Sequence, residues 1–358
     1  MTDSAGHPAL RSRWANAETL RVASNWVIIL AGSWWILGQL ASVMRPLLLA
    51  VFLGYVLMPY YSRLRGKVAA PVALSVLAGL TTVVLIGVAV AMYASLLGLK
   101  DDLPELKRSA STTAKLATDF VTAYLPSYAA ERGPDSRPIG NQVGEFMTTA
   151  ILQGVNVAAG GLLEAATAGL YLLFIMLESA RFPKRVRTAY PFERAEEILD
   201  IAGAINSAII SFIRAKVFSG LILAAIVWFI LGLGGVKFSF LWAMLTFLCN
   251  FIPYIGSVIS YGLPTGFALL QFQFGWNFGI VAVVLLAAHV ICATTLEPML
   301  IGRAVGLSPL VVLAALSVWG LVWGLPGMFL AVPLTVVAKI VFEHIEVTRP
   351  IGRLLSGD

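Results

Sequence analysis

Residues 238–296 contain no Asp, Glu, Lys or Arg. One membrane-spanning helix needs about 20 apolar residues, so this run is too long for a single crossing. It must fold back inside a bilayer or cross it more than once. The composition agrees, because 59% of the residues are hydrophobic and only 12% are charged, whereas soluble domains carry about 25% charged residues. An ordinary soluble enzyme of this size is therefore excluded.

Two interruptions divide this charge-free run, one at residues 250–256 around Pro253 and one at residues 262–264 around Pro264. A second charge-free run, residues 304–338, is interrupted at residues 324–327 and at Pro333. Proline removes a backbone donor, and glycine weakens a helix. Broken backbone at membrane depth persists only against other protein or beside a watery cavity. Interrupted apolar helices therefore point to a transport site.

The sequence predicts an all-α polytopic membrane protein with about eight transmembrane or re-entrant segments, broken helices and an external helical hairpin. Arg45 and Pro46 are expected to separate a first span, 26–44, from a short apolar stretch, 47–61. Charge and hydropathy divide the chain into seven parts: a cytoplasmic N-terminal segment (1–21), N-terminal membrane helices (22–99), an external amphipathic region (100–154), a membrane helix (155–178), a cytoplasmic basic and amphipathic segment (179–216), a membrane core with broken helices (217–342) and a cytoplasmic tail (343–358). Amphipathic pieces at about 142–155 and at 200–216 are expected to lead into the apolar spans 155–177 and 217–236.

The net charge of +6 is explained by topology. Basic residues gather beside membrane spans on the cytoplasmic side, and here they lie near the N-terminus, at residues 63–67 and at residues 181–194. This pattern places the N-terminus and the segments at 63–67 and 181–194 in the cytoplasm, and residues 100–154 outside. The basic residues flank apolar segments and form no face with interleaved aromatics, so no nucleic-acid partner is expected.

Residues 262–269 and 324–331 share a Gly-Leu-Pro start followed by a similar apolar pattern. Matching broken segments in two parts of a chain are typical of repeated transporter architecture. Chance similarity between apolar sequences is the alternative, and the match alone does not decide between them.

Three segments carry a resemblance to the AI-2E family of bacterial membrane transporters: NFIPYIG at 250–256, EPMLIGRAVGLSP at 297–309 and GLPGMFLAVPL at 324–334. Residues 46–59 and 212–214 are similar to earlier parts of the family pattern. The resemblance implies an inner-membrane protein of about eight helical segments that forms a homo-oligomer. Members are described as exporters of autoinducer-2 or as sodium/proton antiporters. The chain departs from the family at residues 293–296, where many relatives have an amide-rich stretch.

An ionisable side chain inside a membrane span costs free energy, so its presence there suggests a functional role. Glu164 is a candidate proton or cation carrier, or a wet position near the external end of its span. His289 is a candidate proton relay, or a neutral imidazole bonded to a nearby carbonyl. Glu297 either lines a cavity mouth or caps a turn.

The residues around the first break, Asn250, Pro253, Tyr254 and Gly256, are expected to present carbonyls or amides to a solute, and Pro326 marks the second break. The alternative is a kink that only shapes packing. Lys216 is interpreted as a snorkelling residue at the cytoplasmic lip.

These observations favour a secondary transporter or exporter of a small polar solute or cation, working by alternating access and coupled to protons in one version of the hypothesis. Its partners are the lipid bilayer and a small polar solute, a monovalent cation or a proton. A passive oligomeric pore and a non-transporting scaffold that binds a partner through its external region are alternatives. No phosphate-binding loop, cysteine pair or zinc spacing occurs, so no enzyme activity, cofactor or metal is expected.

Overall fold

The computed structural model describes residues 21, 24–25, 27–29, 31–64, 66–124, 139–179, 181–301 and 306–357. The helices in chain order are α2 (Ala41–Leu64), α3 (Ala70–Asp101), α4 (Leu103–Tyr124), α6 (Ile139–Ser179), α7 (Phe182–Ala189), α8 (Phe192–Leu233), α9 (Ser239–Cys249), α10 (Ile255–Phe272), α11 (Trp276–Ile291), the π-helical segment η1 (Cys292–Leu296), α12 (Glu297–Ile301), α13 (Pro309–Trp323), α14 (Leu325–His344) and α15 (Arg349–Leu354).

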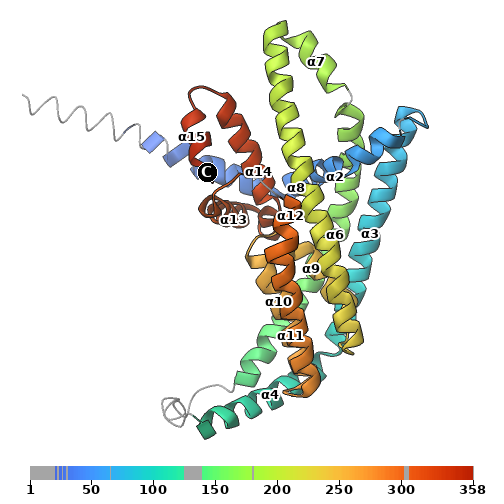
Figure 1. Cartoon of the computed structure of the whole chain (residues 1–358), viewed down its shortest axis with the longest axis vertical. Helices are drawn as coiled ribbons and strands as arrows, with labels where there is room; N and C mark the ends of the chain where they lie inside the picture. The colour runs from blue at the N-terminus through green and yellow to red at the C-terminus, as the bar shows by residue number, and fades with distance from the viewer. Residues whose placement is uncertain are drawn as a thin grey trace, which may run out of the picture.

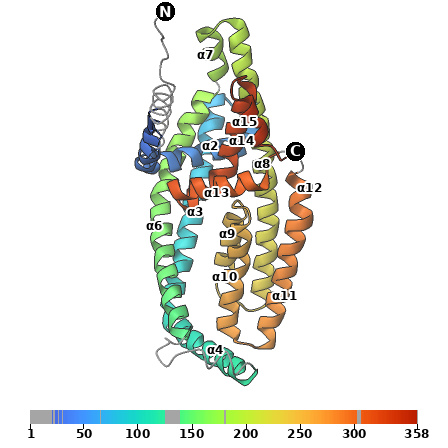
Figure 2. The ribbon, with the colours of Figure 1, turned by 90° about the vertical axis from the view of Figure 1, so that its left-hand side faces the viewer.

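The molecule is an elongated helical bundle (Figure 1). Seven of the described helices are long and apolar enough to cross a membrane, judged by length and composition. Helices satisfy every backbone group internally, which lipid demands of a spanning segment. Helix α4 lies at one end of the long axis and α7 at the other (Figures 1 and 2). The predicted all-α polytopic membrane fold is confirmed.

The region predicted to be an external hairpin consists of α4 and the first part of α6. Helix α4 packs against α6, and a Cβ on Gly140 would meet the backbone of Ser111 at 2.6 Å. The connection between these helices, residues 125–138, lies outside the described residues, as does nearly all of the predicted N-terminal segment 1–21. The basic cluster on α7 lies at the opposite end of the molecule from α4 (Figure 2).

Three prolines that were expected to interrupt helices lie inside continuous ones, so those predictions were wrong. Pro46 is within α2, Pro264 within α10 and Pro333 within α14. All three are buried. Each proline costs one backbone hydrogen bond, and neighbouring helices offset that cost inside a membrane protein by packing around the kink.

Two long helices each join an expected amphipathic piece to the apolar span that follows it. Helix α6 runs without a break through residue 155, and α8 runs without a break through Lys216. No proline or glycine pair interrupts the backbone at either place, so an amphipathic segment simply continues into an apolar one. The division of the chain into external, membrane and cytoplasmic parts at these points stays a prediction, since composition alone marks it.

Helices α9 and α10 form a helical hairpin. Helix α9 has 11 residues, which span about 16 Å, roughly half the bilayer core. The chain then turns at Asn250–Tyr254 and returns along α10. The backbone amide of Lys237, just before α9, donates to Oε1 of Gln271, near the end of α10, at 2.9 Å. Both ends of the hairpin therefore lie at the α4 end of the molecule, and its tip lies inside the bundle.

Helices α13 and α14 form a second broken pair, in which α13 lies across the long axis (Figures 1 and 2). The break is at Gly324, whose φ is +68°. The two breaks meet, because Phe251 beside the first tip stacks on Phe329 of α14 with ring centroids 4.5 Å apart. Phe52 of α2 contacts both rings. In lipid such packing, rather than water exclusion, holds helices together.

One glycine at each break allows a close approach of backbone. A Cβ on Gly256 would overlap the carbonyl of Cys249, and a Cβ on Gly327 would overlap the carbonyl of Trp319. The structural likeness is thus between the α9–α10 and α13–α14 breaks. The repeat proposed from residues 262–269 and 324–331 was wrong, because the first segment lies within α10 and the second begins at a break.

Gly256→Ala is expected to destabilise the protein by at least 1–3 kcal/mol, because the added methyl group overpacks the turn against backbone that cannot yield. Gly262→Ala is the matched control, since Gly262 lies in the same helix with open space around its Cβ position and alanine favours helix. Thermal unfolding of the purified variants in detergent measures both. Equal melting temperatures would contradict the close approach.

Candidate transport site

The tip of the α9–α10 hairpin has a distorted but largely satisfied backbone. Asn250 caps the end of α9, and Tyr254 has φ 61° and ψ −62° immediately before α10. The amides of Phe251, Ile252 and Gly256 donate to carbonyls within the turn or the preceding helix. Pro253 has no amide to satisfy. The carbonyl of Asn250 is the acceptor that finds its partner on another helix.

That partner is Lys216 of α8, which is only 3% exposed. Its ammonium group donates to the Asn250 carbonyl at 3.1 Å and forms an ion pair with Glu297. In return, the side-chain amide of Asn250 donates to the backbone carbonyl of Lys216 at 3.2 Å and to Oγ of Ser219 at 3.1 Å. The tip is therefore joined to α8 in both directions, and the buried charge of Lys216 is compensated, as a buried charge must be.

Glu297 reaches this site because of the π-helical segment before it. In η1, the amide of Glu297 bonds to the carbonyl of Cys292, five residues earlier. Such single π turns re-aim side chains and are frequent at functional sites. The segment coincides with residues 293–296, where the sequence departs from the amide-rich pattern. Thr294 and Thr295 are exposed there, so their side chains do not replace amides at the ion pair.

A small, partly open cavity lies beside the ion pair. Its volume is about 10 Å³, enough for one water molecule at most. Side chains from α8, α10, α11 and η1 surround it with the tip, and they are mostly polar or small: Ser219, Leu223, Asn250, Ser257, His289, Cys292, Ala293 and Glu297. The structure thus places His289, Asn250 and Glu297, three residues predicted from the sequence, around one cavity.

His289 ties α11 to α10 and is 8% exposed. Its Nδ1 lies 2.9 Å from the carbonyl of Leu285, and its Nε2 lies 3.0 Å from Oγ of Ser260. The contact with a carbonyl requires a proton on Nδ1, so in the neutral ring Nε2 accepts from Ser260. A doubly protonated ring would reverse that bond, and Ser260 could then donate to the carbonyl of Ser257 at 3.2 Å. This geometry is compatible with both expected roles of His289, a proton relay and a neutral imidazole bonded to a nearby carbonyl.

The other residues predicted from the sequence do not line this cavity. Gly256 is buried in the tip turn, whereas Tyr254 is 54% exposed. Pro326 begins α14 beside the second break, away from the residues that surround the cavity. Glu164 is half-buried on α6, a helix that packs mainly against α2, α3 and α4. It lies apart from the ion pair, and its role stays a prediction.

Sequence reasoning missed Lys216. The pattern that could have found it is an ionisable side chain in a continuous apolar helix, where charge needs a partner. The assumed start of the membrane span at residue 217 hid that pattern and favoured a snorkelling lysine at the span end. The structure buries Lys216 within α8, so that interpretation was wrong.

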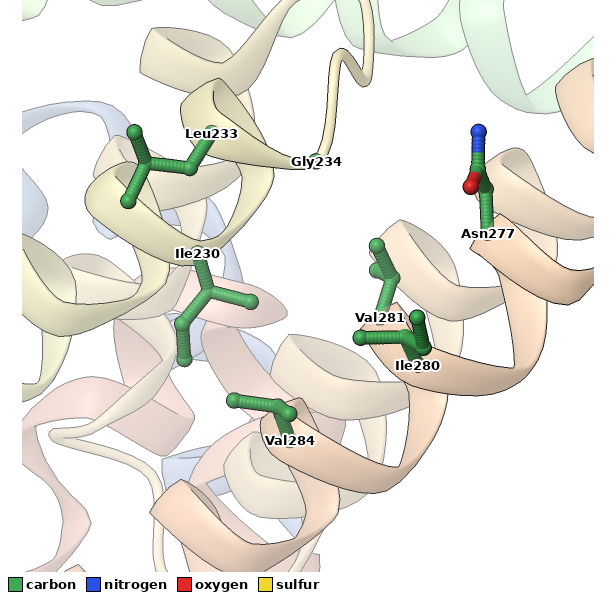
Figure 3. Close-up of a pocket in the computed structure, with 7 residues that line it drawn as sticks. All are labelled: Ile230, Leu233, Gly234, Asn277, Ile280, Val281 and Val284. Carbon is green, nitrogen blue, oxygen red and sulfur yellow. The ribbon is translucent and has the colours of Figure 1, made fainter.

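A larger cavity of about 370 Å³ opens between the end of α8 and the start of α11. Figure 3 shows Ile230 facing Ile280 and Val284 across it, with Leu233 turned away and Asn277 at one side. Its lining is almost entirely aliphatic, so it offers little to bind a polar solute. Within the described residues, no group of three or more His, Cys, Asp or Glu could hold a metal ion.

Comparison with known proteins decides the family. The model of the AI-2E family transporters matches residues 24–346. The chain belongs to this family. Among AI-2E relatives, the "Putative transport protein YhhT" of Escherichia coli K12 is 31% identical over 323 residues, 88% of each chain. The "AI-2 transport protein TqsA" of the same organism is 27% identical over 345 residues, 92% of this chain and 93% of the relative.

Membership of the AI-2E family establishes a membrane protein of a transport family and agrees with the expectation from the sequence motifs. All three motifs that carried the resemblance fall at or beside the features described above. The first is the hairpin tip, the second begins with Glu297, and the third begins at Gly324.

Removing one partner of the ion pair is expected to destabilise this AI-2E protein more than removing both. Lys216→Met or Glu297→Gln alone leaves an uncompensated charge or carbonyl and should cost about 3 kcal/mol, the low end for a buried pair because Glu297 is 29% exposed. The double variant should cost clearly less than the sum. A double-mutant cycle by thermal unfolding measures the coupling, and additive effects would show that the two side chains do not interact.

Proposed function

We propose that this protein is a secondary transporter or exporter that moves a small polar solute or cation by alternating access around the α9–α10 hairpin. The observation that carries the proposal is the buried Lys216–Glu297 pair at the broken tip of this helical hairpin. Broken helices with polar groups near the bilayer midplane are the usual form of a transporter binding site. The family supports transport in general, and the site supports this mechanism.

In the proposed site, the positive charge of Lys216 compensates the negative charge of Glu297. Lys216 supplies one positive charge to the Glu297 carboxylate and to the Asn250 carbonyl. A cation or proton that reaches Glu297 competes with the ammonium group for the same oxygens, which frees Lys216 from the tip. A solute with hydroxyl groups can instead bind Asn250, Ser219 and Glu297 without disturbing the charge balance. Either event changes the contact between α8 and the hairpin.

The small size of the cavity favours a carrier over a pore through this site that stays open. A volume of about 10 Å³ does not admit a solute, so the hairpin or its neighbours must move for binding. Gly220 of α8 lies against the tip, with only 3.1 Å between its Cβ position and the Asn250 amide. Because the Asn250 side chain packs this closely on α8, a small displacement of the tip breaks several contacts together.

The proposed setting is the bacterial inner membrane, with both termini and the α7 end in the cytoplasm and the α4 end outside. Basic residues on and around α7 support this orientation. A homo-oligomer is part of the proposal on the strength of the family resemblance alone.

Flux into proteoliposomes, screened over monovalent cations and small hydroxylated metabolites, tests the proposal. For any solute that the wild type moves, Glu297→Gln and Lys216→Met are expected to lower the flux roughly tenfold or more, the effect of losing one interaction of about 1.4 kcal/mol. Glu178→Gln is the matched control, because Glu178 pairs with Arg185 on an exposed surface. Full flux in both site variants would exclude this pair from the pathway.

The pH dependence of the same flux tests proton coupling. If Glu297 or His289 carries the coupled proton, Glu297→Gln or His289→Ala should flatten the pH profile. An unchanged profile in both variants would remove these residues from coupling. A current of fixed conductance that needs no driving gradient would favour the passive pore instead.

A further inference from the structure

Backbone strain in the described residues is concentrated in the α9–α10 hairpin. Only three of their non-glycine residues have positive φ: Phe238 at 60°, Tyr254 at 61° and Gln273 at 55°. They stand at the start of α9, at the tip and at the end of α10. Gln273 also has ψ −147°, which approaches a region that glycine alone adopts readily. Such strain persists only where surrounding contacts hold it, and it gathers in elements that switch.

The contacts that hold the base of the hairpin converge on Lys237, which lies between α8 and α9. Its ammonium group lies 3.0 Å from Oδ2 of Asp102 and 3.5 Å from Oε2 of Glu105, at the corner between α3 and α4. Its amide donates to Gln271 of α10, and its carbonyl accepts from the indole of Trp242 in α9 at 3.2 Å. One residue thus joins both arms of the hairpin to the α3–α4 corner.

The ion pairs keep Lys237 charged. The hydrogen bond that Lys237 donates to Asp102, followed by the negative charges of Asp102 and Glu105, raises the pKa of Lys237 above its ordinary value. The Lys237 side chain is half exposed, so each pair is weak and open to water. Contacts of this kind hold a strained element in place while still allowing it to be released.

The aromatic ring of Phe238 packs beside these contacts of Lys237. Its ring lies against Gly98 of α3, with 3.1 Å between the ring and the position that a Cβ on Gly98 would take. It also meets Phe267 of α10, with ring centroids 6.0 Å apart. The hairpin is therefore held at both ends by lysines, Lys216 at the tip and Lys237 at the base, with a strained residue beside each.

We propose that the α9–α10 hairpin moves as one unit about its strained turns, and that the clamp between Lys237 and the acidic α3–α4 corner controls when the cavity at its tip opens. The clamp is defined by Lys237, Asp102, Glu105 and Gln271. The inference deepens the proposed function and rests on it for its consequence in transport. Release of the clamp frees the base and lets the strained turns relax. Relaxation of these turns moves the hairpin tip away from Lys216.

The native cysteines provide a test that needs no knowledge of the solute. Cys292 lines the cavity beside Glu297 and is 8% exposed. In a Cys249→Ala background it is the sole cysteine, so its alkylation by N-ethylmaleimide in lipid nanodiscs reports cavity opening from either face. Lys237→Met is expected to raise the alkylation rate about fivefold or more, because release of weak ion pairs shifts the opening equilibrium by such a factor. Lys237→Arg should stay close to the parent.

Gln273→Gly supplies an effect of the opposite sign, which loss of structure cannot produce. Glycine removes the strain from the closed conformation, so this variant should be alkylated more slowly than the parent. Arg194→Ala breaks an exposed ion pair with Glu197 elsewhere on α8 and should leave the rate unchanged. Faster alkylation in Lys237→Met together with slower alkylation in Gln273→Gly supports the clamp. Equal rates in Lys237→Met and the parent, or acceleration in both variants, would overturn it.

The alkylation experiment and the flux experiment can each contradict one proposal without contradicting the other. A protein that follows the expected alkylation pattern but moves no solute would contradict the proposed function and leave the clamp standing. Flux that depends on Glu297, together with alkylation indifferent to Lys237, would contradict the clamp alone.

Discussion

The Lys216 ammonium group, bound to the Asn250 carbonyl and the Glu297 carboxylate, is the interaction on which the rest of the site depends. A helix that ends inside a bilayer leaves carbonyls that lipid cannot satisfy. Lys216 satisfies one of them, and Glu297 compensates the charge that this requires. Without the lysine, the tip would keep an unpaired carbonyl inside the bundle, and without the glutamate the lysine would be a buried charge without a partner.

The arrangement of the helices follows from this constraint. Helix α8 carries Lys216 to the level of the tip, and the π turn in η1 turns Glu297 toward it. Gly256 and Gly327 let the two broken pairs fold tightly, and Phe52, Phe251 and Phe329 fill the space where they meet. Helices α2, α3 and α6 pack together around their own core, with Ala168 and Leu172 fully buried. This second group of helices supports the hairpin and contributes no side chain to its cavity.

Much of the fold was predictable because lipid permits few solutions. A charge-free run of that length had to be helical and had to turn back, and the break at residues 250–256 was found from its proline and glycine. The breaks assigned to Pro46, Pro264 and Pro333 were wrong because a proline's effect depends on what packs around it. Local sequence does not report that packing. Near Pro253 and Pro326 the helix does end, and there a positive-φ residue, Tyr254 or Gly324, accompanies the proline.

The site was predictable in part for a related reason. Asn250, His289 and Glu297 stood out because polar residues in apolar segments need explanation. Lys216 lies 34 residues before Asn250 and 81 before Glu297, so no local pattern could join them. Its burial was hidden by the basic residues that precede α8 along the chain and make a span end plausible. The strained turns likewise depend on contacts between distant segments.

An experimental structure in lipid nanodiscs tests the central claim most directly. It should show the turn at residues 250–254 about halfway through the bilayer, with the Lys216 side chain within hydrogen-bonding distance of both the Asn250 carbonyl and the Glu297 carboxylate. A turn that emerges at the far membrane surface, with Lys216 extended to lipid headgroups and away from Glu297, would contradict the account.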